Sequence, residues 1–201
     1  MATATNTKEN VNVLIVGVGG QGIILASRII SQAFVEAGYD VKQSEVHGMA
    51  QRGGAVSSHI RAGEKVYSPL IPDEAADFIL SFEKLEALRY MNYVSAKTTA
   101  MINDQRIDPP SVAAGKQEYP ADIEARLKKK TDKVMFVPAD KIAAELGNDR
   151  VVNSILTGVV AAHLNIEEGI WKKTFEATVP PKLLELNLKA FGRGFEFGRG
   201  K

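Results

Sequence analysis

The sequence predicts an α/β fold: a Rossmann-like, mostly parallel sheet with helices on both faces, a β-hairpin insertion and a helical C-terminal segment. Short apolar, β-branched runs alternate along the chain with segments of helical periodicity, which is typical of such sheets. The first apolar run ends in glycines that lead directly into a helical pattern. The 201 residues fit a single domain, which we expect at 11–201 behind a flexible N-terminus at 1–10.

The N-terminal third predicts a strand, a helix and a second strand. Residues 11–18 form an apolar β-branched run, which indicates a buried parallel strand. Residues 23–37 repeat apolar side chains on one helical face, and Gly38 follows as a stop. Residues 40–46 then read as the second strand. We interpret this as the strand, turn, helix and strand at one edge of a doubly wound sheet.

A hairpin is predicted next, with strands at 55–61 and 65–68 around Gly63. The rest of the chain continues the alternation. Strands are expected at 76–82, 98–103 and 133–138, helices at 83–93, 121–130, 140–146, 151–164, 167–177 and 182–197, and a proline-containing loop at 108–115.

Composition excludes several classes of function. The net charge of +1 argues against a nucleic-acid partner, because phosphate binding needs a concentrated basic surface. The chain has no cysteine, so it offers no thiolate for zinc or an iron–sulfur cluster, and its three scattered histidines make no metal signature. No apolar stretch is long enough to span a membrane, and residues 1–10 do not resemble a secretory signal. We therefore expect a cytoplasmic protein without a membrane partner.

Two segments indicate a binding site. The first is the glycine-rich turn, in which Gly17, Gly19 and Gly22 match G-x-G-x-x-G. The second is SEVHGMAQRGG at 44–54, where Glu45 and His47 could handle protons and Arg52 could contact an anion. The candidate binding residues are Gly17, Gly19, Gly20, Gln21, Gly22, Ser44, Gly48, Gln51, Arg52, Gly53 and Gly54.

Each segment also has a plainer interpretation. The glycine-rich turn could hold the phosphates of a dinucleotide at a helix N-terminus, with Glu45 as the acidic residue of such a site. Alternatively, its glycines only allow close packing of a strand, a helix or a partner chain. The polar residues of 44–54 could likewise satisfy one another in a structural loop, although binding residues do concentrate in loops held by a scaffold.

Taken together, the motifs resemble the gamma-type subunit or domain of 2-oxoacid:ferredoxin oxidoreductases. The resemblance covers about residues 12–192 and rests on GVGGQGIILAS, SEVHGMAQRGG, VYSPLIP, ADFILSFEKLEALRY and VPPKLLELNLKAF. The last stretch favours the indolepyruvate type, whose smaller subunit is called beta. A pyruvate or branched-chain 2-oxoacid gamma subunit is the alternative within the family.

The resemblance implies a function that the residues alone do not establish. Enzymes of this family decarboxylate a 2-oxoacid oxidatively to an acyl-CoA and pass electrons to ferredoxin. It implies that a larger alpha subunit carries thiamine diphosphate, magnesium and the iron–sulfur clusters, and that this chain binds no cofactor alone and is active only in the complex. The candidate residues would then either line a coenzyme A or substrate channel or contact the larger subunit. A free-standing nucleotide-binding domain and a purely structural partner remain alternatives, and the isolated chain could form a homodimer.

Overall fold

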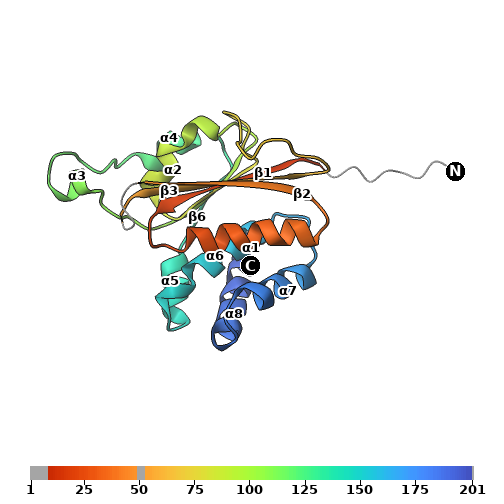
Figure 1. The fold of residues 1–201 in the computed structure, drawn as a ribbon. Coiled ribbons are helices and arrows are strands. Elements are labelled where there is room, and N and C mark those ends of the chain that lie inside the picture. The colour runs from red at the N-terminus through yellow and green to blue at the C-terminus, as the bar shows by residue number, and fades with distance from the viewer. Residues whose placement is uncertain (1–8, 49–52, 201) are drawn as a thin grey trace.

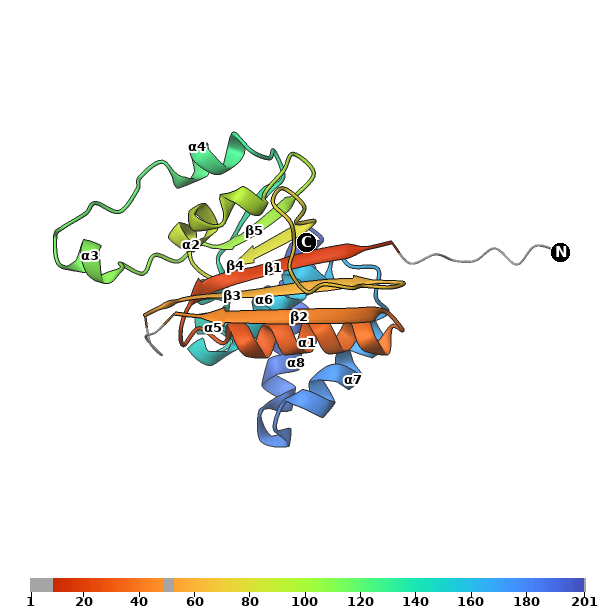
Figure 2. The same cartoon turned by 45° about the horizontal axis from the view of Figure 1, so that its top comes forward.

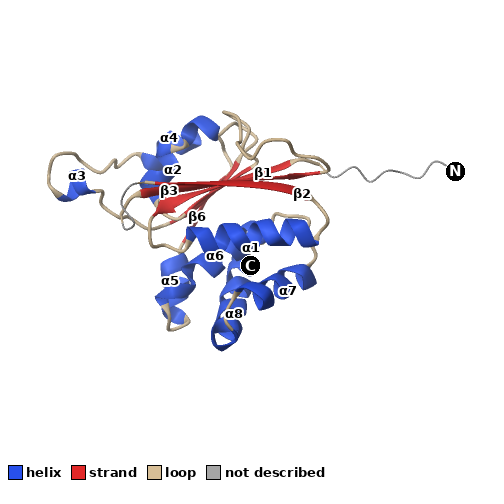
Figure 3. Cartoon of the chain, in the orientation of Figure 1, coloured by secondary structure: helices blue, strands red, loops and turns tan. Residues whose placement is uncertain are grey.

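The computed structural model describes residues 9–48 and 53–200, which form a sheet between two layers of helices (Figures 1 and 3). Within those residues six strands make one sheet in the order β2-β3-β1-β4-β5-β6. The strands are β1 Val11–Val18, β2 Asp40–His47, β3 Ala55–Gly63, β4 Phe78–Ser81, β5 Thr99–Asn103 and β6 Val134–Val137. Strands β1, β4, β5 and β6 pair in parallel, whereas β3 pairs antiparallel with both β1 and β2. The predicted fold class is confirmed.

The larger helical layer covers the face of the sheet that carries Val13, Ile15 and Ile60. It contains α1 Ile23–Glu36, α5 Ala139–Glu145, α6 Val152–Ala161, α7 Glu168–Thr178 and α8 Pro181–Gly198. The opposite face carries Leu14, Val16 and Ile79 and packs against α2 Lys84–Arg89 and α4 Ile123–Lys128. A short helix, α3 Pro110–Ala113, stands away from both layers in Figure 2. Helical turns η1 Met91–Tyr93 and η2 Asp149–Val151 complete the elements.

The C-terminal helices pack unusually closely. Every residue of α6 is buried, including the polar Asn153, Ser154 and Thr157. A Cβ on Gly194 of α8 would lie 1.9 Å from the carbonyl oxygen of Ile155, and one on Gly158 of α6 would lie 2.1 Å from the carbonyl oxygen of Phe191. The glycines therefore allow the two backbones to touch, which builds much of the main core.

The predicted hairpin was wrong in its pairing. Strand β3 extends to Gly63, but its hairpin partner is β2, and residues 65–68 form no strand. Side chains hold that segment instead: the Asp40 carboxylate accepts a hydrogen bond from the Val66 N–H, and Arg61 donates to the carbonyls of Ser68 and Leu70. Gly63 and its polar neighbours look like a hairpin turn in the sequence, but they end a strand here.

Two smaller predictions also need correction. The predicted loop at 108–115 contains α3, which Pro110 begins because proline suits the first helical position. The predicted helix at 83–93 is interrupted after Arg89 and resumes as η1. The expected flexible N-terminus falls mainly outside the described residues. None of the helices in the described ranges has both the length and the apolar character needed to cross a membrane.

Candidate functional site

The glycine-rich turn leaves the N-terminus of α1 open. Gly22 precedes the helix with a left-handed backbone, φ 84°, a conformation that glycine adopts without a steric penalty. No side chain in the described residues caps this end, and the first turn of α1 carries no acidic residue. The first N–H groups of a helix lack intrahelical acceptors and give this end a partial positive charge. The turn is thus able to receive an anionic group.

The end of the β2–β3 hairpin lies beside this turn. The Gly19 N–H donates to the Gly54 carbonyl at 2.8 Å, and the Gly48 N–H donates to the Ala55 carbonyl at 2.9 Å. Between turn and hairpin lies a pocket of about 500 Å³. It is lined by Gly19, Gly20, Gly22, Ile23, Ile24, His47, Gly48 and Val56. The structure therefore brings the two segments singled out in the sequence together in one pocket.

Glu45 and His47 have different positions in this site. Glu45 Oε1 accepts hydrogen bonds from Ser27 Oγ at 3.0 Å and Gln43 Nε2 at 2.7 Å, which tie it beneath α1. Its Oε2 lies 3.6 Å from His47 Nε2. The His47 side chain is 46% exposed and lines the pocket. Glu45 is thus in place to orient His47, and His47 is the side chain that a ligand would meet.

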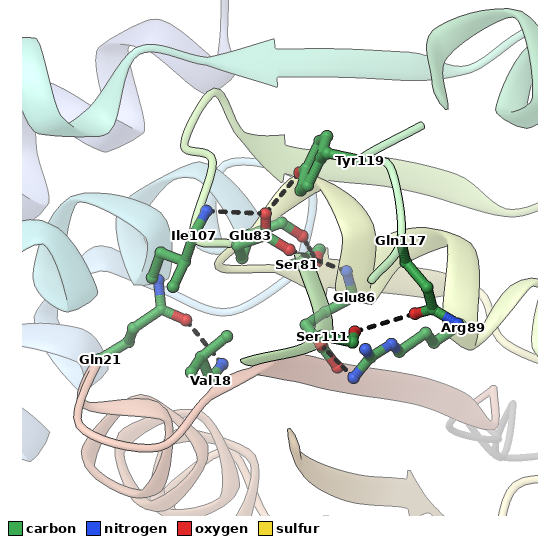
Figure 4. A network of polar contacts seen from close by, with 10 residues as sticks. All are labelled: Val18, Gln21, Ser81, Glu83, Glu86, Arg89, Ile107, Ser111, Gln117 and Tyr119. Atoms are coloured by element: carbon green, nitrogen blue, oxygen red, sulfur yellow. Dashed lines mark hydrogen bonds and ion pairs between the residues drawn. The ribbon is translucent and has the colours of Figure 1, made fainter. Parts of the chain in front are cut away.

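Gln21 turns away from the pocket. Its Oε1 accepts the Val18 N–H at 2.7 Å, and its Nε2 donates to the Phe82 carbonyl at 2.9 Å and to Gln105 Oε1 at 2.6 Å. These bonds join the turn to the carboxyl ends of β4 and β5, and Figure 4 draws the bond between Gln21 and Val18. Gln105 in turn donates to Asp140 at 3.0 Å. Gln21 therefore braces the turn rather than facing a ligand.

The other candidate residues have different positions. Some serve packing, some lie near the pocket, and two fall outside the residues that the structure describes. A Cβ on Gly17 would lie 2.7 Å from the Cβ of Phe82, so this glycine serves packing. Ser44 points to the sheet face opposite Glu45, since side chains alternate along a strand. Gly53 and Gly54 stand at the hairpin end. Gln51 and Arg52 lie outside the described residues.

Sequence reasoning missed the apolar wall of the pocket. Ile23, Ile24 and Val56 line it, yet in the sequence they look like ordinary core positions. Ile24 is 42% exposed although it lies on a helix that covers the sheet. An apolar residue on the solvent side of the first helical turn was the signal that could have revealed it.

Sequence reasoning also missed a buried carboxylate at the end of β4. Glu83 is 1% exposed and caps α2 by accepting the Glu86 N–H at 3.0 Å. Its other oxygen accepts the Ile107 N–H at 3.1 Å and the Tyr119 hydroxyl at 2.5 Å (Figure 4). An acidic residue directly after a buried strand was the available signal, because ligands and polar networks gather at the carboxyl ends of such strands.

Comparison with known proteins decides the family. The family model of pyruvate ferredoxin/flavodoxin oxidoreductase matches residues 12–197. The chain belongs to this family. It is 39% identical to the Indolepyruvate oxidoreductase subunit IorB of Archaeoglobus fulgidus, over 92% of this chain and 93% of that one. The family resemblance found in the sequence is thereby confirmed.

Two other proteins that are similar to this chain are longer. The Ketoisovalerate oxidoreductase subunit VorA of Methanothermobacter marburgensis is 26% identical, and the match covers 95% of this chain but 37% of that one. A solved 2-oxoglutarate:ferredoxin oxidoreductase from Magnetococcus marinus has a TM-score of 0.74 and 20% identity, and the match covers 96% of this chain and 32% of that one. The same fold is therefore one part of a larger polypeptide in those proteins.

The side chains of this protein that could ligate a metal do not suit an iron–sulfur cluster. The chain contains no cysteine, and its described residues bring no three histidine or carboxylate side chains together. Iron–sulfur clusters need cysteine thiolates in most cases, with histidine as an occasional replacement. The residues present therefore do not fit such a cluster. The pocket beside α1 offers backbone N–H groups, an imidazole and an apolar wall instead.

Proposed function

We propose that this chain is the small, beta-type subunit of an indolepyruvate:ferredoxin oxidoreductase. The supporting observation is the level of identity, 39% to the Archaeoglobus IorB subunit along nearly the whole of both chains, against 26% to the ketoisovalerate subunit. In this proposal the complex decarboxylates an arylpyruvate oxidatively, forms an acyl-CoA and passes electrons to ferredoxin. The chain acts in the cytoplasm and is active only in the complex.

The proposal divides the chemistry between two chains. A larger alpha subunit holds thiamine diphosphate with magnesium and the iron–sulfur clusters, which supply the decarboxylation and the electron transfer. The absence of cysteine from this chain supports that division, because a thiolate-ligated cluster then needs the other chain. This chain contributes binding and positioning.

The pocket beside α1 is where this contribution takes place. Coenzyme A is anionic, and the open N-terminus of α1 provides N–H groups and a favourable dipole for a phosphate. His47, whose Nε2 lies 3.6 Å from Glu45 Oε2, adds a hydrogen-bonding group, and the wall formed by Ile23, Ile24 and Val56 excludes water from one side. The Magnetococcus enzyme, which has this fold, was solved with coenzyme A bound. The residues that we propose for this role are Gly19, Gly20, Gly22, His47 and Gly48, with Glu45 as a positioning residue.

A second role for the same surface has its own support. Ile24 and Val46 are 42% and 57% exposed, and exposed apolar side chains of this size are common at interfaces between subunits. In that case the turn and the hairpin would contact the larger subunit and no coenzyme A. The two roles predict different effects of a charge placed at Ile24.

The deciding experiment replaces Ile24 by Glu and, as a neutral control, by Gln. An acidic residue in the first turn should stabilise α1 by about 0.3–1 kcal/mol, since it complements the helix dipole. The same charge should repel coenzyme A, so that the KM for coenzyme A in the assembled complex rises by about tenfold, equivalent to about 1.4 kcal/mol. Ile24→Gln should change KM much less. Loss of assembly with an unchanged KM in the remaining complex would instead support the interface role.

A further inference from the structure

The segment between β5 and α4 packs very little against its own chain. From Asp104 to Asp122 every residue is exposed or half-buried and none is buried. Figure 2 shows this segment, which we call the α3 arm (residues 104–122), as a long arc extending beyond the sheet. Ordered segments of this length usually bury some apolar side chains of their own or serve a function. The α3 arm therefore needs another explanation for its position.

Polar contacts hold the α3 arm at both of its ends. The Glu83 carboxylate accepts the Ile107 N–H near the start of the arm and the Tyr119 hydroxyl near its end. The Arg106 guanidinium lies 4.4 Å from the centre of the Tyr119 ring, which adds a cation–π contact. Figure 4 shows Ile107 and Tyr119 converging on Glu83. One buried carboxylate thus ties the two ends of the arm to the body of the protein without covering its surface.

Beneath the α3 arm lies a groove of about 460 Å³. Leu85 on α2 and Val112 and Pro120 on the arm give it apolar walls, while Arg89 and Glu118 contribute charges of opposite sign. Arg89 is held by an ion pair with Glu86 at 2.8 Å, and the Glu86 side chain is only 3% exposed. A preorganised apolar centre with charged groups beside it is the usual anatomy of a protein interface.

We propose that the α3 arm and this groove form the docking surface for the larger subunit, which inserts an apolar side chain between Leu85 and Val112. This inference rests on the proposed function, in which a larger subunit exists. Its support comes from the longer similar proteins, in which the region matching this chain makes up 37% of the ketoisovalerate chain and 32% of the Magnetococcus chain. In those proteins a covalent link keeps the fold beside the rest of the enzyme. A separate chain needs a noncovalent surface for the same task, and the α3 arm is fixed in advance for it.

The test measures binding of the full-length chain to the purified larger subunit. Val112→Arg places a charged side chain in the groove and should raise the dissociation constant at least about tenfold, as expected for a central interface residue. Val35→Arg is the matched control, because Val35 is 48% exposed on α1 and far from the α3 arm in sequence. It should change the dissociation constant by less than about twofold, as a substitution outside the interface does. Glu118→Lys, which leaves the apolar walls intact, should also weaken binding.

Thermal unfolding of each free variant establishes that it folds. The inference is overturned if Val112→Arg and Glu118→Lys both fold and bind as tightly as the unaltered chain. It is equally overturned if Val35→Arg weakens binding as much as Val112→Arg does. The KM for coenzyme A in any complex that forms should stay unchanged in these variants. A failure of the coenzyme A proposal would therefore appear in the Ile24 variants and not in the variants of the α3 arm. If the unaltered chain does not bind the larger subunit at all, both the proposed function and this inference are refuted.

Discussion

The hydroxyl of Tyr119 donates a hydrogen bond to the buried carboxylate of Glu83 across 2.5 Å, joining residues 36 positions apart. Burial, and then this hydrogen bond, raises the pKa of Tyr119 well above that of an ordinary tyrosine, so the phenol stays a neutral donor. We expect Tyr119→Phe to lower the free energy of unfolding by about 1.5–3 kcal/mol, the range for hydrogen bonds to charged groups. Urea unfolding measures this loss.

Tyr67→Phe is the control for that substitution. Tyr67 is 88% exposed, so removing its hydroxyl should leave the free energy of unfolding within about 0.5 kcal/mol of the unaltered chain. Equal effects of the two substitutions would show that Glu83 does not stabilise the α3 arm through Tyr119.

The contact between α6 and α8 predicts a sharp contrast within one helix. Gly194→Ala would place a Cβ 1.9 Å from the Ile155 carbonyl oxygen, so the helices must separate. Overpacking of this kind costs about 1–3 kcal/mol or more. Gly192→Ala, two residues away, meets no atom within 4 Å and should stabilise α8 by up to about 1 kcal/mol, because alanine favours helices. Thermal unfolding of both variants shows whether the stability falls for Gly194→Ala and rises for Gly192→Ala. A stabilising Gly194→Ala would refute the close packing.

Two histidines, the buried His59 and the more exposed His163, predict that stability falls in mild acid. Burial lowers the pKa of His59, and partial desolvation lowers that of the more exposed His163, below the value of about 6.5 that they have in the unfolded chain. As the pH falls through about 6.5, the unfolded chain therefore takes up protons that the folded chain does not, and the free energy of unfolding decreases. The decrease should be smaller in His59→Gln and smaller still when His163→Gln is added. Urea unfolding at about pH 7.5 and pH 5.5 measures it. Parallel pH profiles in all three proteins would contradict the assignment.

The position of Gln21 predicts a loss of stability rather than of ligand binding. Gln21→Met keeps the length of the side chain but leaves the Val18 N–H and the Phe82 carbonyl without this partner. The Phe82 carbonyl keeps its bond from Asn103 Nδ2, whereas an unsatisfied Val18 N–H costs about 1–3 kcal/mol, so the free energy of unfolding should fall by about that amount. The matched control is Gln32→Met on the exposed side of α1, where the Gln32 side chain donates a hydrogen bond to Glu36 at the surface. A large rise in the KM for coenzyme A without a loss of stability would instead mean that Gln21 contacts the ligand.

The sequence predicted the fold class, and it singled out two segments that meet at one pocket in the structure, for a common reason. Both follow from local sequence patterns, because β1, the turn and α1 are adjacent in the chain. The residues that the apolar periodicity places in the core are buried in the structure. The pairing of β3 was mispredicted because the choice between a partner at 65–68 and one at 40–47 depends on tertiary contacts, such as the bond from the Val66 N–H to Asp40. The role of Gln21 was hidden for the same reason. Its partners Phe82 and Gln105 lie 61 and 84 positions away.

The position of β3 has a consequence for nucleotide chemistry. In dinucleotide-binding folds, an acidic residue at the end of the strand next to β1 reaches the ribose. Here β3 lies between β1 and β2, with Val56 paired to Gly17 on one side and to His47 on the other. Because adjacent strands are about 4.8 Å apart, Glu45 stands two spacings, roughly 9.6 Å, from the strand that carries the glycines. The Glu45 carboxylate is instead engaged by Ser27 and Gln43, which favours a ligand or partner that needs no contact with it.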